Sequence, residues 1–500
     1  IIKFVPFGFL DMPREVFLSQ KATINIAEKT LLASPLLGSG PGTFAYNYSK
    51  FKPESINQEI FWNLRFGSGA SEVLNGIITT GILGFLALLF VFGSFLWLGF
   101  RYLKSKMTQK DNDSGWLLGV GIVSGFVGLI LGYFLYPANF SLWLIFWIFL
   151  SGLVVLSKKK DAEFEIRSEA KATVSVFLIL ILILAFGLIL AGAPKYLAEV
   201  RYLSGIRALE KQDIDLTIKR LQEAIVLSPS VDTYHRELSQ FYLVKLNSIL
   251  SQKDLSPETA NSQVQNMVSA IVQSADKAII LDPRNVLNWN VRGFIYQNLI
   301  GFSGDAADLG IVSYGKAAEL DPVNPSIFTE IGRIYIAKSD SAGQESPEKA
   351  ANLQLASENI QKAISLKGDY LPAHILRAVF YSRNNQLQEA IAEMENVKQV
   401  ASFDANLTFQ LAIMYYDNNQ LDEAKEELED VLRLDENFVT ARYFLGLIYD
   451  KKGDKPAAIS QFEILQKLNP DNENIKDILS NLKNGKDALD GISPPSENLF

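Results

Sequence analysis

The chain has 500 residues, 48% of them hydrophobic, and its mean hydropathy of +0.12 is too high for an ordinary soluble protein. Its charge is uneven: residues 1–195 carry 17 basic and 12 acidic side chains, whereas residues 196–500 carry 30 and 43. This composition excludes a disordered chain and a basic nucleic-acid-binding domain. Because the chain has no cysteine, thiol catalysis, disulfide frameworks and cysteine-ligated zinc or iron–sulfur clusters are also excluded.

The first segment, residues 1–75, precedes any membrane-spanning pattern. It opens with IIKFVPFGFL, which has neither an initiator Met nor a signal-peptide pattern, so we expect Ile1 to be an internal position of a longer protein. Residues 13–34 place four apolar side chains on one helical stripe, and we predict an amphipathic helix there that lies on the membrane or on the domain. The stripe consists of Phe17, Ile24, Ala27 and Leu31.

A glycine-rich loop, PLLGSGPGTF, follows over residues 35–44. Gly38, Gly40 and Gly42, together with Pro41, should end the helix and leave backbone N–H groups free. Such a loop can approach an anionic phosphate or a sugar closely, which makes the three glycines candidate substrate-binding residues. The alternative is an ordinary turn.

Four uncharged stretches are long enough to cross a bilayer as helices of about 30 Å at 1.5 Å per residue. We predict spans at 76–100, 115–136, 137–157 and 172–194. The second and third are continuous in hydrophobicity, but Tyr136-Pro137-Ala138-Asn139 has the residues of a turn and divides them into a hairpin.

The short connections between spans predict the orientation, because Lys and Arg are retained on the cytoplasmic side. The two basic connections should therefore be cytoplasmic, which puts residues 1–75 and everything after Lys195 outside. The basic residues are Arg101, Lys104, Lys106 and Lys110 after the first span, and Lys158, Lys159, Lys160, Arg167 and Lys171 after the third.

Several motifs in this part occur together in one order: PLLGSGPGTF, then Arg65-Phe66, then Ala70-Ser71-Glu72-Val73-Leu74, then TGILGFL from Thr80. Read together, they resemble the C-terminal half of the O-antigen ligase and Wzy-type polymerase family, over roughly residues 13–157. The resemblance implies a multi-pass bacterial inner-membrane protein that transfers a lipid-diphosphate-linked glycan on the outer face.

The chain departs from this family at one position. Many of its ligases have a His eleven residues before the Gly of the T-G-x-x-G turn, where this chain has Ala70. Without this His, the resemblance implies two remaining roles. Arg65, with Lys50 and Lys52 adding positive charge, would face the diphosphate, and Glu72 would accept a proton from the acceptor hydroxyl. Alternatively, Arg65 is a headgroup-level anchor and Glu72 favours the N-terminus of the first span. We predict no metal and no cofactor.

From Ala198 the sequence repeats with a period of 34 residues. With Gly446 at position 8, Tyr449 falls at position 11, Ala458 at 20 and Phe462 at 24, a pattern that resembles the tetratricopeptide repeat (TPR). We count seven units over residues 198–472, with insertions in the earlier ones, and predict an α-solenoid. A capping helix at 473–485 and a disordered tail at 486–500 should follow.

The position of a residue within the repeat predicts whether it packs between helices or lines the groove. His235, Trp289, Phe328 and His374 all fall at position 4, which predicts packing between helices and not metal binding or catalysis. Positions 2, 5, 9, 12 and 13 should line a concave groove that holds a protein or glycan partner, or is simply solvated. The groove candidates are Asn290, Gln297, Asn298, Arg333, Arg383, Phe409, Tyr416, Asp417, Tyr443, Asp450 and Lys451.

The predicted fold is all-α: four transmembrane helices followed by a solenoid of about seven TPR units. One functional hypothesis is an O-antigen-type glycan ligase or polymerase whose repeats recruit an acceptor or partners. Another is a non-catalytic membrane-anchored scaffold for protein–protein interaction, and a third is protein O-glycosylation by a related transferase. The acidic array argues against a nucleic acid as partner.

Overall fold

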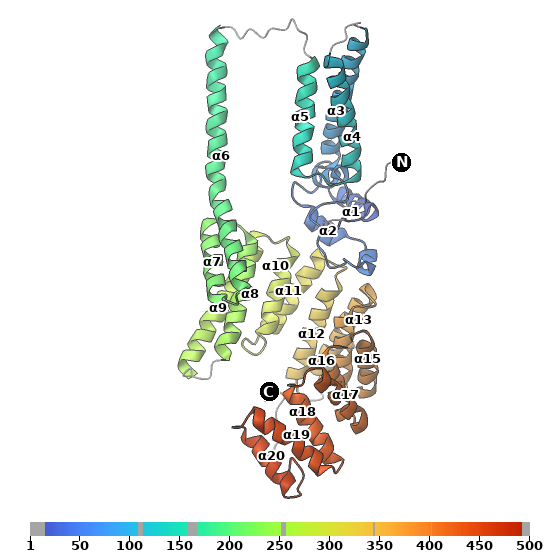
Figure 1. The fold of residues 1–500 in the computed structure, drawn as a ribbon, viewed down its shortest axis with the longest axis vertical. Coiled ribbons are helices and arrows are strands. Elements are labelled where there is room, and N and C mark those ends of the chain that lie inside the picture. Colours follow the sequence, from blue (N-terminus) through green and yellow to red (C-terminus); the bar gives the residue numbers. More distant parts are fainter. Residues whose placement is uncertain are drawn as a thin grey trace, which may run out of the picture. The chain divides into compact units, whose positions relative to one another are not determined.

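The structure is a computed structural model that describes residues 16–108, 114–157, 168–251, 257–343, 346–401 and 403–492. Within these ranges the chain is helical apart from turns and one isolated bridge between Ile300 and Ser303 (Figure 1). It forms two compact units, Ile1–Asn324 and Pro325–Phe500. The predicted all-α fold is therefore confirmed.

Three short helices precede the membrane part: α1 (Gln20–Ala33), α2 (Phe44–Phe51) and the 3-10 helix η1 (Glu54–Gln58). The Ser19 side chain caps α1 by accepting the Ala22 N–H. The buried stripe differs from the predicted one, because α1 packs through Ala22, Thr23, Ile26, Ala27 and Thr30. Of the predicted stripe, Ala27 is buried, whereas Phe17 and Ile24 are about half exposed.

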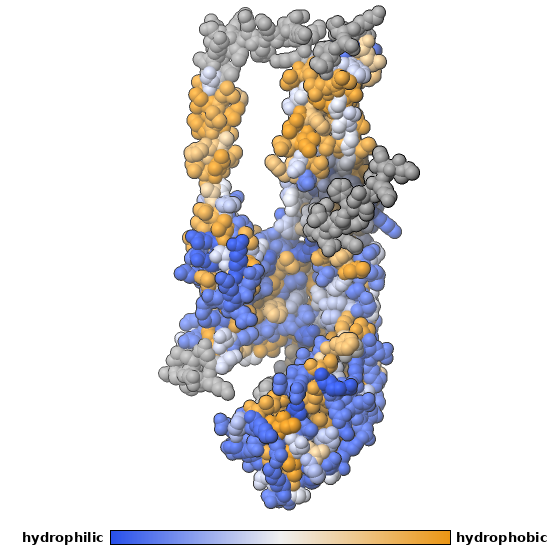
Figure 2. Space-filling view, viewed as in Figure 1, coloured by the Kyte–Doolittle hydropathy of each residue, from blue (hydrophilic) through white to orange (hydrophobic). Residues whose placement is uncertain are grey.

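Four helices are long and apolar enough to cross a membrane: α3 (Glu72–Thr108), α4 (Ser114–Leu135), α5 (Phe140–Ser157) and α6 (Ser168–Leu209). Figure 2 shows the apolar surface concentrated on these helices and a largely hydrophilic surface over the repeats. The helices differ from the predicted spans at their ends, since α3 starts four residues before 76 and α5 starts three residues after 137. Of the basic residues used to predict orientation, Lys110, Lys158, Lys159, Lys160 and Arg167 lie outside the described residues.

Aromatic side chains hold α3, α4 and α5 together. Phe95 of α3 stacks on Phe126 of α4 with ring centroids 3.6 Å apart, and Phe126 lies 5.3 Å from Phe146 of α5. Glycine makes room for a further ring: a β-carbon at Gly125 would lie 2.8 Å from the Phe149 ring. In the membrane-spanning window of α6, by contrast, no residue is buried. Dispersion between rings thus packs three of the four helices.

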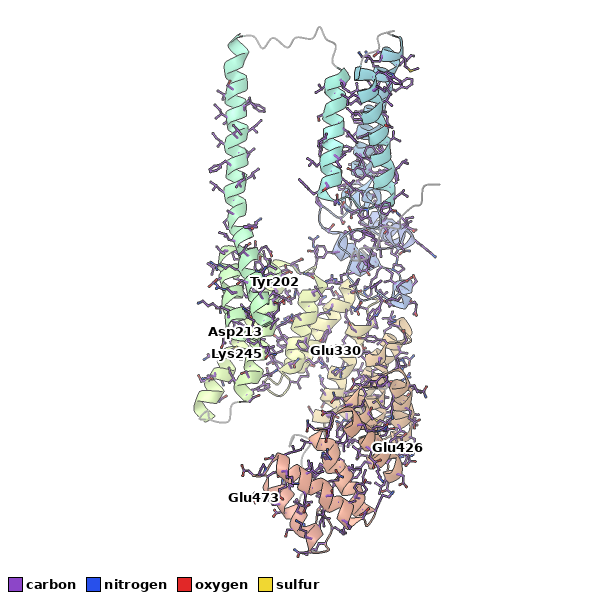
Figure 3. The ribbon with its side chains drawn as sticks, in the orientation of Figure 1. Tyr202, Asp213, Lys245, Glu330, Glu426 and Glu473 are labelled. Carbon is purple, nitrogen blue, oxygen red and sulfur yellow. The ribbon has the colours of Figure 1, made fainter. Side chains whose placement is uncertain are left out.

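Helix α6 passes from the membrane segment into the first repeat without interruption, although Pro194 lies inside it. We predicted a span that ends at residue 194 and repeats that start at residue 198, but the helix continues through this boundary without a break. Tyr202, near the end of α6, packs against Tyr234 of the next repeat at 5.3 Å, and Asp213 caps the helix that follows by accepting the Leu216 N–H (Figure 3). Span and first repeat helix are one element.

The described residues form seven helix pairs after the membrane part, as predicted. Within each of the two units, each pair packs against the next one, and α20 follows the last pair where we predict the capping helix. The first helix of the first pair is the end of α6; the other helices are α7 (Ile214–Leu227), α8 (Asp232–Leu250), α9 (Pro257–Leu281), α10 (Val286–Asn298), α11 (Ala306–Leu320), α12 (Pro325–Ser341), α13 (Pro347–Leu366), α14 (Leu371–Arg383), α15 (Leu387–Val400), α16 (Ala405–Asp417), α17 (Leu421–Leu434), α18 (Val439–Lys451), α19 (Lys455–Leu468) and α20 (Glu473–Lys483).

Small residues set the approach of the paired helices, as the repeat register predicts. A side chain at Gly446 would meet the Phe462 ring at 2.6 Å, and one at Gly293 would meet the Tyr314 ring at 2.8 Å. The alanines of positions 8 and 20 are fully buried, for example Ala412, Ala424 and Ala458. A larger side chain at any of these positions would push the two helices apart.

Two repeat positions also form periodic hydrogen bonds. At position 4, a ring nitrogen bonds the carbonyl oxygen six residues earlier: His235 to Pro229 at 3.2 Å, Trp289 to Pro283 at 2.8 Å and His374 to Gly368 at 2.8 Å. At position 11, the Tyr hydroxyl bonds a side chain twenty residues earlier, as in Tyr415 to Glu395 at 2.5 Å and Tyr449 to Glu429 at 3.2 Å. The two histidines therefore have the packing role that we predict.

The segment after the capping helix is ordered as far as Ile492, so the prediction of a disordered tail from 486 is wrong for residues 486–492. The Ala488 N–H donates to Asp450 at 2.7 Å, and Lys455 donates to the Lys486 carbonyl at 2.6 Å. Ala488 is 1% exposed in the cluster that includes Phe462. The remaining tail, residues 493–500, lies outside the described residues.

Candidate functional site

The glycine-rich loop is paired with a break in helix α3. The N–H groups of Ser39 and Gly40 donate to the carbonyls of Ile78 and Thr79 at 3.0 and 2.9 Å, and those of Ile82 and Leu83 donate back to Pro35 and Leu36 at 3.0 and 3.1 Å. The Gly38 N–H donates to Ser34. Our expectation of free backbone N–H groups is therefore wrong at Gly38 and Gly40, because the end of α1 supplies the acceptor for Gly38 and the broken helix supplies the acceptor for Gly40.

Two glycines make this contact possible. Gly81 has φ 68° and ψ −165°, a region that is essentially restricted to glycine, and it interrupts α3. A side chain at Gly81 would lie 2.4 Å from the Gly38 nitrogen, and one at Gly38 would lie 2.6 Å from the Gly81 nitrogen. Gly42, at φ 73°, faces open space instead. The loop and the T-G-x-x-G segment thus meet backbone to backbone.

Glu72 fastens the first turn of α3 to the hairpin between α4 and α5. Its N–H donates to the Tyr136 carbonyl at 3.0 Å, and its carboxylate accepts the Ala138 N–H at 3.1 Å. Ala70, in the position of the family His, is 6% exposed, and its N–H donates to the Thr23 hydroxyl at 3.0 Å. This geometry agrees with the alternative role for Glu72, a carboxylate at a helix N-terminus.

Lys52 forms a buried ion pair with Asp321, the residue that follows α11. The Lys52 Nζ lies 3.1 Å from Asp321 Oδ1, and the two side chains are 5% and 4% exposed. Burial raises the pKa of the Asp321 carboxyl, and the Lys52 charge opposes that rise. Lys52 is thus held by a carboxylate 269 residues away and is not exposed to a phosphate, contrary to our expectation.

Arg65 lies beside this pair and also reaches the repeats. Its Nη2 donates to the Ser49 hydroxyl at 2.8 Å and its Nη1 to the Asn285 side chain at 3.4 Å. Burial lowers the pKa of the Arg65 guanidinium from its ordinary value, while the nearby Asp321 carboxylate favours the charged form. Lys50, in contrast, is exposed, and its ammonium lies 5.6 Å from the Phe51 ring centroid.

Two further contacts complete a surface that we call the docking loop, residues 44–66. The Tyr46 hydroxyl donates to Asp282, and the Arg284 guanidinium lies 4.9 Å from the Tyr46 ring centroid. Burial, with the hydrogen bond to Asp282, raises the pKa of Tyr46 to about 12. The Asn57 amide donates to the Val323 carbonyl at 2.8 Å. The docking loop therefore binds the turns after α9 and α11.

Sequence reasoning missed the partners of the docking loop. Asp282-Pro283-Arg284-Asn285 and Asp321-Pro322-Val323-Asn324 are the same D-P-x-N turn in successive repeats, and each has an Asp that contacts the loop. The available signal was an acidic residue preceding the position 32 proline in two neighbouring units. It cannot identify the partner, because the same residues also belong to the ordinary turn chemistry of the repeat.

The docking loop contains no pair of groups placed for acid–base or nucleophilic chemistry. Its buried cations are held by acceptors of the same chain, and its buried carboxylate belongs to an ion pair. Over the described residues, no group of three or more His, Asp or Glu side chains could hold a metal ion. The arrangement joins the docking loop to the repeat turns after α9 and α11, and the charges of its Lys52–Asp321 pair are shielded from solvent.

The predicted groove residues of the unit Ile1–Asn324 are involved in local bonds. Gln297 accepts from the Tyr314 hydroxyl at 3.1 Å, and the Asn298 amide donates to the Phe294 carbonyl at 2.8 Å. The Asn290 Oδ1 is buried and has no hydrogen-bond partner among the described residues. Its unpaired oxygen is buried and therefore not open to a partner on the surface.

In the unit Pro325–Phe500, Arg333 pairs with Glu330 at 3.0 Å and Arg383 with Asp340 at 3.2 Å, while Asp417 is exposed. Tyr443 does not line an open surface as expected, because it is 3% exposed and packs edge-on against Phe462 at 5.6 Å.

Partly exposed aromatic rings gather beside these positions and form what we call the aromatic cluster: Phe409, Tyr416, Phe438 and Phe444. Phe409 lies 5.1 Å from Phe438, Tyr416 lies 5.3 Å from Phe444, and the Lys451 ammonium lies 4.0 Å from the Tyr416 ring centroid. We predicted Phe409, Tyr416 and Lys451 from their repeat positions, but Phe438 and Phe444 lie outside the positions that we considered. Rings from α16, α18 and the intervening turn therefore make one apolar surface.

Comparison with known proteins supports the repeat assignment. The tetratricopeptide repeat family model matches residues 409–473. No curated protein matches the sequence.

Three solved structures illustrate the similarity. A tetratricopeptide repeat protein from Parabacteroides merdae is 15% identical, with a TM-score of 0.41, over 57% of this chain and 97% of that one. Pseudomonas aeruginosa pilF is 12% identical (TM-score 0.34; 49% and 98%), and PilW, a type IV pilus biogenesis factor, is 19% identical (TM-score 0.36; 48% and 99%). The part of the chain after the membrane helices is a TPR scaffold, an architecture suited to protein–protein interaction.

Proposed function

We propose that the chain is a membrane-anchored scaffold that holds a protein partner on its repeats at the extracytoplasmic face. The observation that carries this proposal is the double attachment of the first repeats to the membrane part. Helix α6 enters the array directly, and the docking loop binds two repeat turns through the buried Lys52–Asp321 pair. Repeats held at two places, as those before Pro325 are, have a defined orientation that a freely tethered domain does not have.

The aromatic cluster is the surface that we propose for the partner. Aromatic side chains dominate the binding energy of protein interfaces, and these rings are only partly covered by their own unit. Lys451 and the exposed Asp417 add charges of both signs at its edge, which suits a polypeptide better than a strongly charged polymer. The extracytoplasmic side is inferred from the basic residues near the end of α3, Arg101, Lys104 and Lys106.

A photocrosslinking experiment in the source cell tests this proposal. A photoreactive amino acid at Phe444 should give one discrete protein adduct, whereas the same amino acid at Glu426, which is exposed on α17, should give none. The double substitution Tyr416→Ala and Phe438→Ala should abolish the adduct while the protein level in the membrane is unchanged. Equal adducts at Phe444 and Glu426 would show that the aromatic cluster is not a specific partner site.

A second candidate function is glycan transfer of the O-antigen ligase or polymerase type, with a lipid-diphosphate-linked glycan as donor. One observation supports it: two motifs quoted separately for the resemblance, around Gly38 and around Gly81, lie in direct backbone contact. Against it stand Ala70 in the position of the family His and the engagement of Lys52 by Asp321. Arg65 and the exposed Lys50 remain the cations nearest to such a donor.

The surface glycan of the source cell separates the two candidates. Deletion of the complete gene should shorten or remove the attached glycan if the chain is a transferase, and leave it unchanged if the chain is a scaffold alone. Complementation of the deletion with Arg65→Ala and with Asn285→Ala then distinguishes the loss of a cation needed for transfer from the loss of a contact between the docking loop and the repeats. Both variants lose the contact between these residues, but only the first loses the guanidinium. Glycan transfer predicts that Asn285→Ala restores the profile and Arg65→Ala does not.

A further inference from the structure

A cavity of about 250 Å³ lies where α3 is broken, beside the hairpin between α4 and α5. Its polar lining residues are Glu72, Asn75, Thr79 and Thr80, and Tyr133, Trp143 and Phe85 are among its apolar and aromatic walls. This volume is enough for a small polar group.

Apart from the Asn75 side-chain NH2 group, the side-chain polar atoms of Glu72, Thr79 and Thr80 in this cavity offer acceptors. The Thr79 and Thr80 hydroxyls donate to the carbonyls of Asn75 and Gly76 at 2.8 and 2.7 Å, so each keeps only lone pairs for a ligand. The Tyr133 hydroxyl likewise donates to the Leu142 carbonyl at 3.1 Å. A ligand that itself needs donors, such as a sugar hydroxyl using its oxygen, would leave that oxygen unsatisfied.

Two further residues of the cavity, Asn75 and Glu72, can accept more hydrogen bonds than they receive. The Asn75 Oδ1 is buried and has no hydrogen-bond partner among the described residues, which costs free energy unless something donates to it. The Glu72 carboxylate accepts from the Ala138 N–H and from the Trp143 side chain, but a carboxylate has about four lone-pair sites. Among the cavity's described lining residues there is no Lys, Arg or His. A phosphate would therefore meet a carboxylate and no cation.

We propose that this cavity binds a protonated primary amine. An ammonium group has three donors and no acceptor, so it satisfies Asn75 and the threonine hydroxyls together, and its charge complements Glu72. Tyr133 and Trp143, whose ring centroids lie 5.4 Å apart, line the cavity with aromatic side chains, which attract cations. Because the cavity lies at the end of the span nearer the array, the amine comes either from a lipid headgroup or from a small soluble molecule.

Native mass spectrometry of the full chain in detergent tests the proposal with three short-chain lipids that share their acyl chains. Phosphatidylethanolamine should bind at least tenfold more tightly than phosphatidylglycerol, which has no amine, and than phosphatidylcholine, whose ammonium has no N–H to donate. Free ethanolamine distinguishes the two sources: displacement of the lipid indicates recognition of the amine alone, and persistence indicates recognition of the whole headgroup.

Matched variants identify the site. Glu72→Gln keeps an oxygen for the Ala138 N–H and removes the charge, and it should weaken phosphatidylethanolamine binding about tenfold. Glu54→Gln removes an exposed carboxylate in η1 and should change nothing. Asn75→Leu, which removes the unpaired acceptor, gives an independent second variant if Glu72→Gln does not fold. Equal binding of the three lipids by the wild-type chain, or wild-type selectivity in both cavity variants, would overturn the proposal.

Discussion

The buried ion pair between Lys52 and Asp321 is the residue-level basis of the docking loop. Removing one member of a buried pair leaves the other charge without compensation, and this typically costs about 3–5 kcal/mol. Replacing both by apolar residues of similar size is far less costly. The energy of docking therefore depends on both residues together.

We expect Lys52→Met alone to loosen the docking loop strongly and the double variant Lys52→Met, Asp321→Leu to recover much of the loss. Hydrogen exchange of the backbone amides of residues 44–66 reports the opening of the loop directly. Glu28→Gln, which removes an exposed carboxylate of α1, is the control and should leave the exchange unchanged. Equal loosening in the single and double variants would show that the pair is not coupled.

Gly81 allows a second residue-level prediction. Its backbone conformation is essentially restricted to glycine, and a β-carbon would collide with the Leu36 and Gly38 backbones. We expect Gly81→Ala to destabilise the membrane part by about 3 kcal/mol or more. Gly76→Ala is the control, since a side chain there meets nothing within 4 Å and alanine favours a helix. Thermal unfolding in detergent compares the two, and equal midpoints would contradict the expectation.

His235 predicts a pH dependence. Burial lowers its pKa below the ordinary value, with Lys277 acting in the same direction and Asp232 against it. The unfolded state therefore binds the proton more readily, so the stability from neutral His235 is complete above about pH 6.5 and is lost as the pH falls through the lowered pKa. The unfolding midpoint of His235→Gln should fall less than that of the wild type between about pH 7 and about pH 5. Parallel curves would refute this.

At the scale of elements, the C-terminal segment is the clearest addition to the repeat pattern. Ala488 is buried against the last repeat, and Asp450 and Lys455 bind the backbone around it. We expect Ala488→Lys to destabilise the last helix pair by about 2 kcal/mol or more, because it places a charge in an apolar cluster. Asp487→Asn, at a 92% exposed side chain, should change the midpoint little. Protease sensitivity of the last repeat measures both.

The repeat helices could be predicted because their determinants are local. The buried alanines and the close approach at Gly446 recur every 34 residues, so the helix pairs and the packing roles of His235 and His374 follow from spacing alone. The docking loop could not be predicted in the same way. Its ion pair joins residues 269 apart, and neither residue carries a local pattern that distinguishes it from a surface charge. The same holds for Gly40, whose N–H group donates to a carbonyl at the break in another helix.

At the scale of the molecule, the side of the membrane that carries the repeats is open to a direct measurement. The chain contains no cysteine, so single cysteines can be introduced without background. If the basic residues near the end of α3 are cytoplasmic, a cysteine at Asn139 or Glu54 should react with an impermeant maleimide added to intact cells, or to spheroplasts if an outer membrane is present. A cysteine at Lys106 should react only after the membrane is permeabilised. The opposite pattern would place the repeats inside the cell.

Helix α6 joins the membrane to the first repeat without a flexible connection, and this makes its length a matter of rotation as well as of distance. Each residue added to a helix turns everything beyond it by about 100° and moves it by 1.5 Å. Two extra residues would thus turn the first repeat roughly half a revolution away from the docking loop, whereas seven would return it to within about 20° of its starting direction. The contact between the docking loop and the repeats should therefore survive insertions of about seven residues in α6, but not insertions of two. A rigid helical connection behaves in this way, whereas a flexible linker does not.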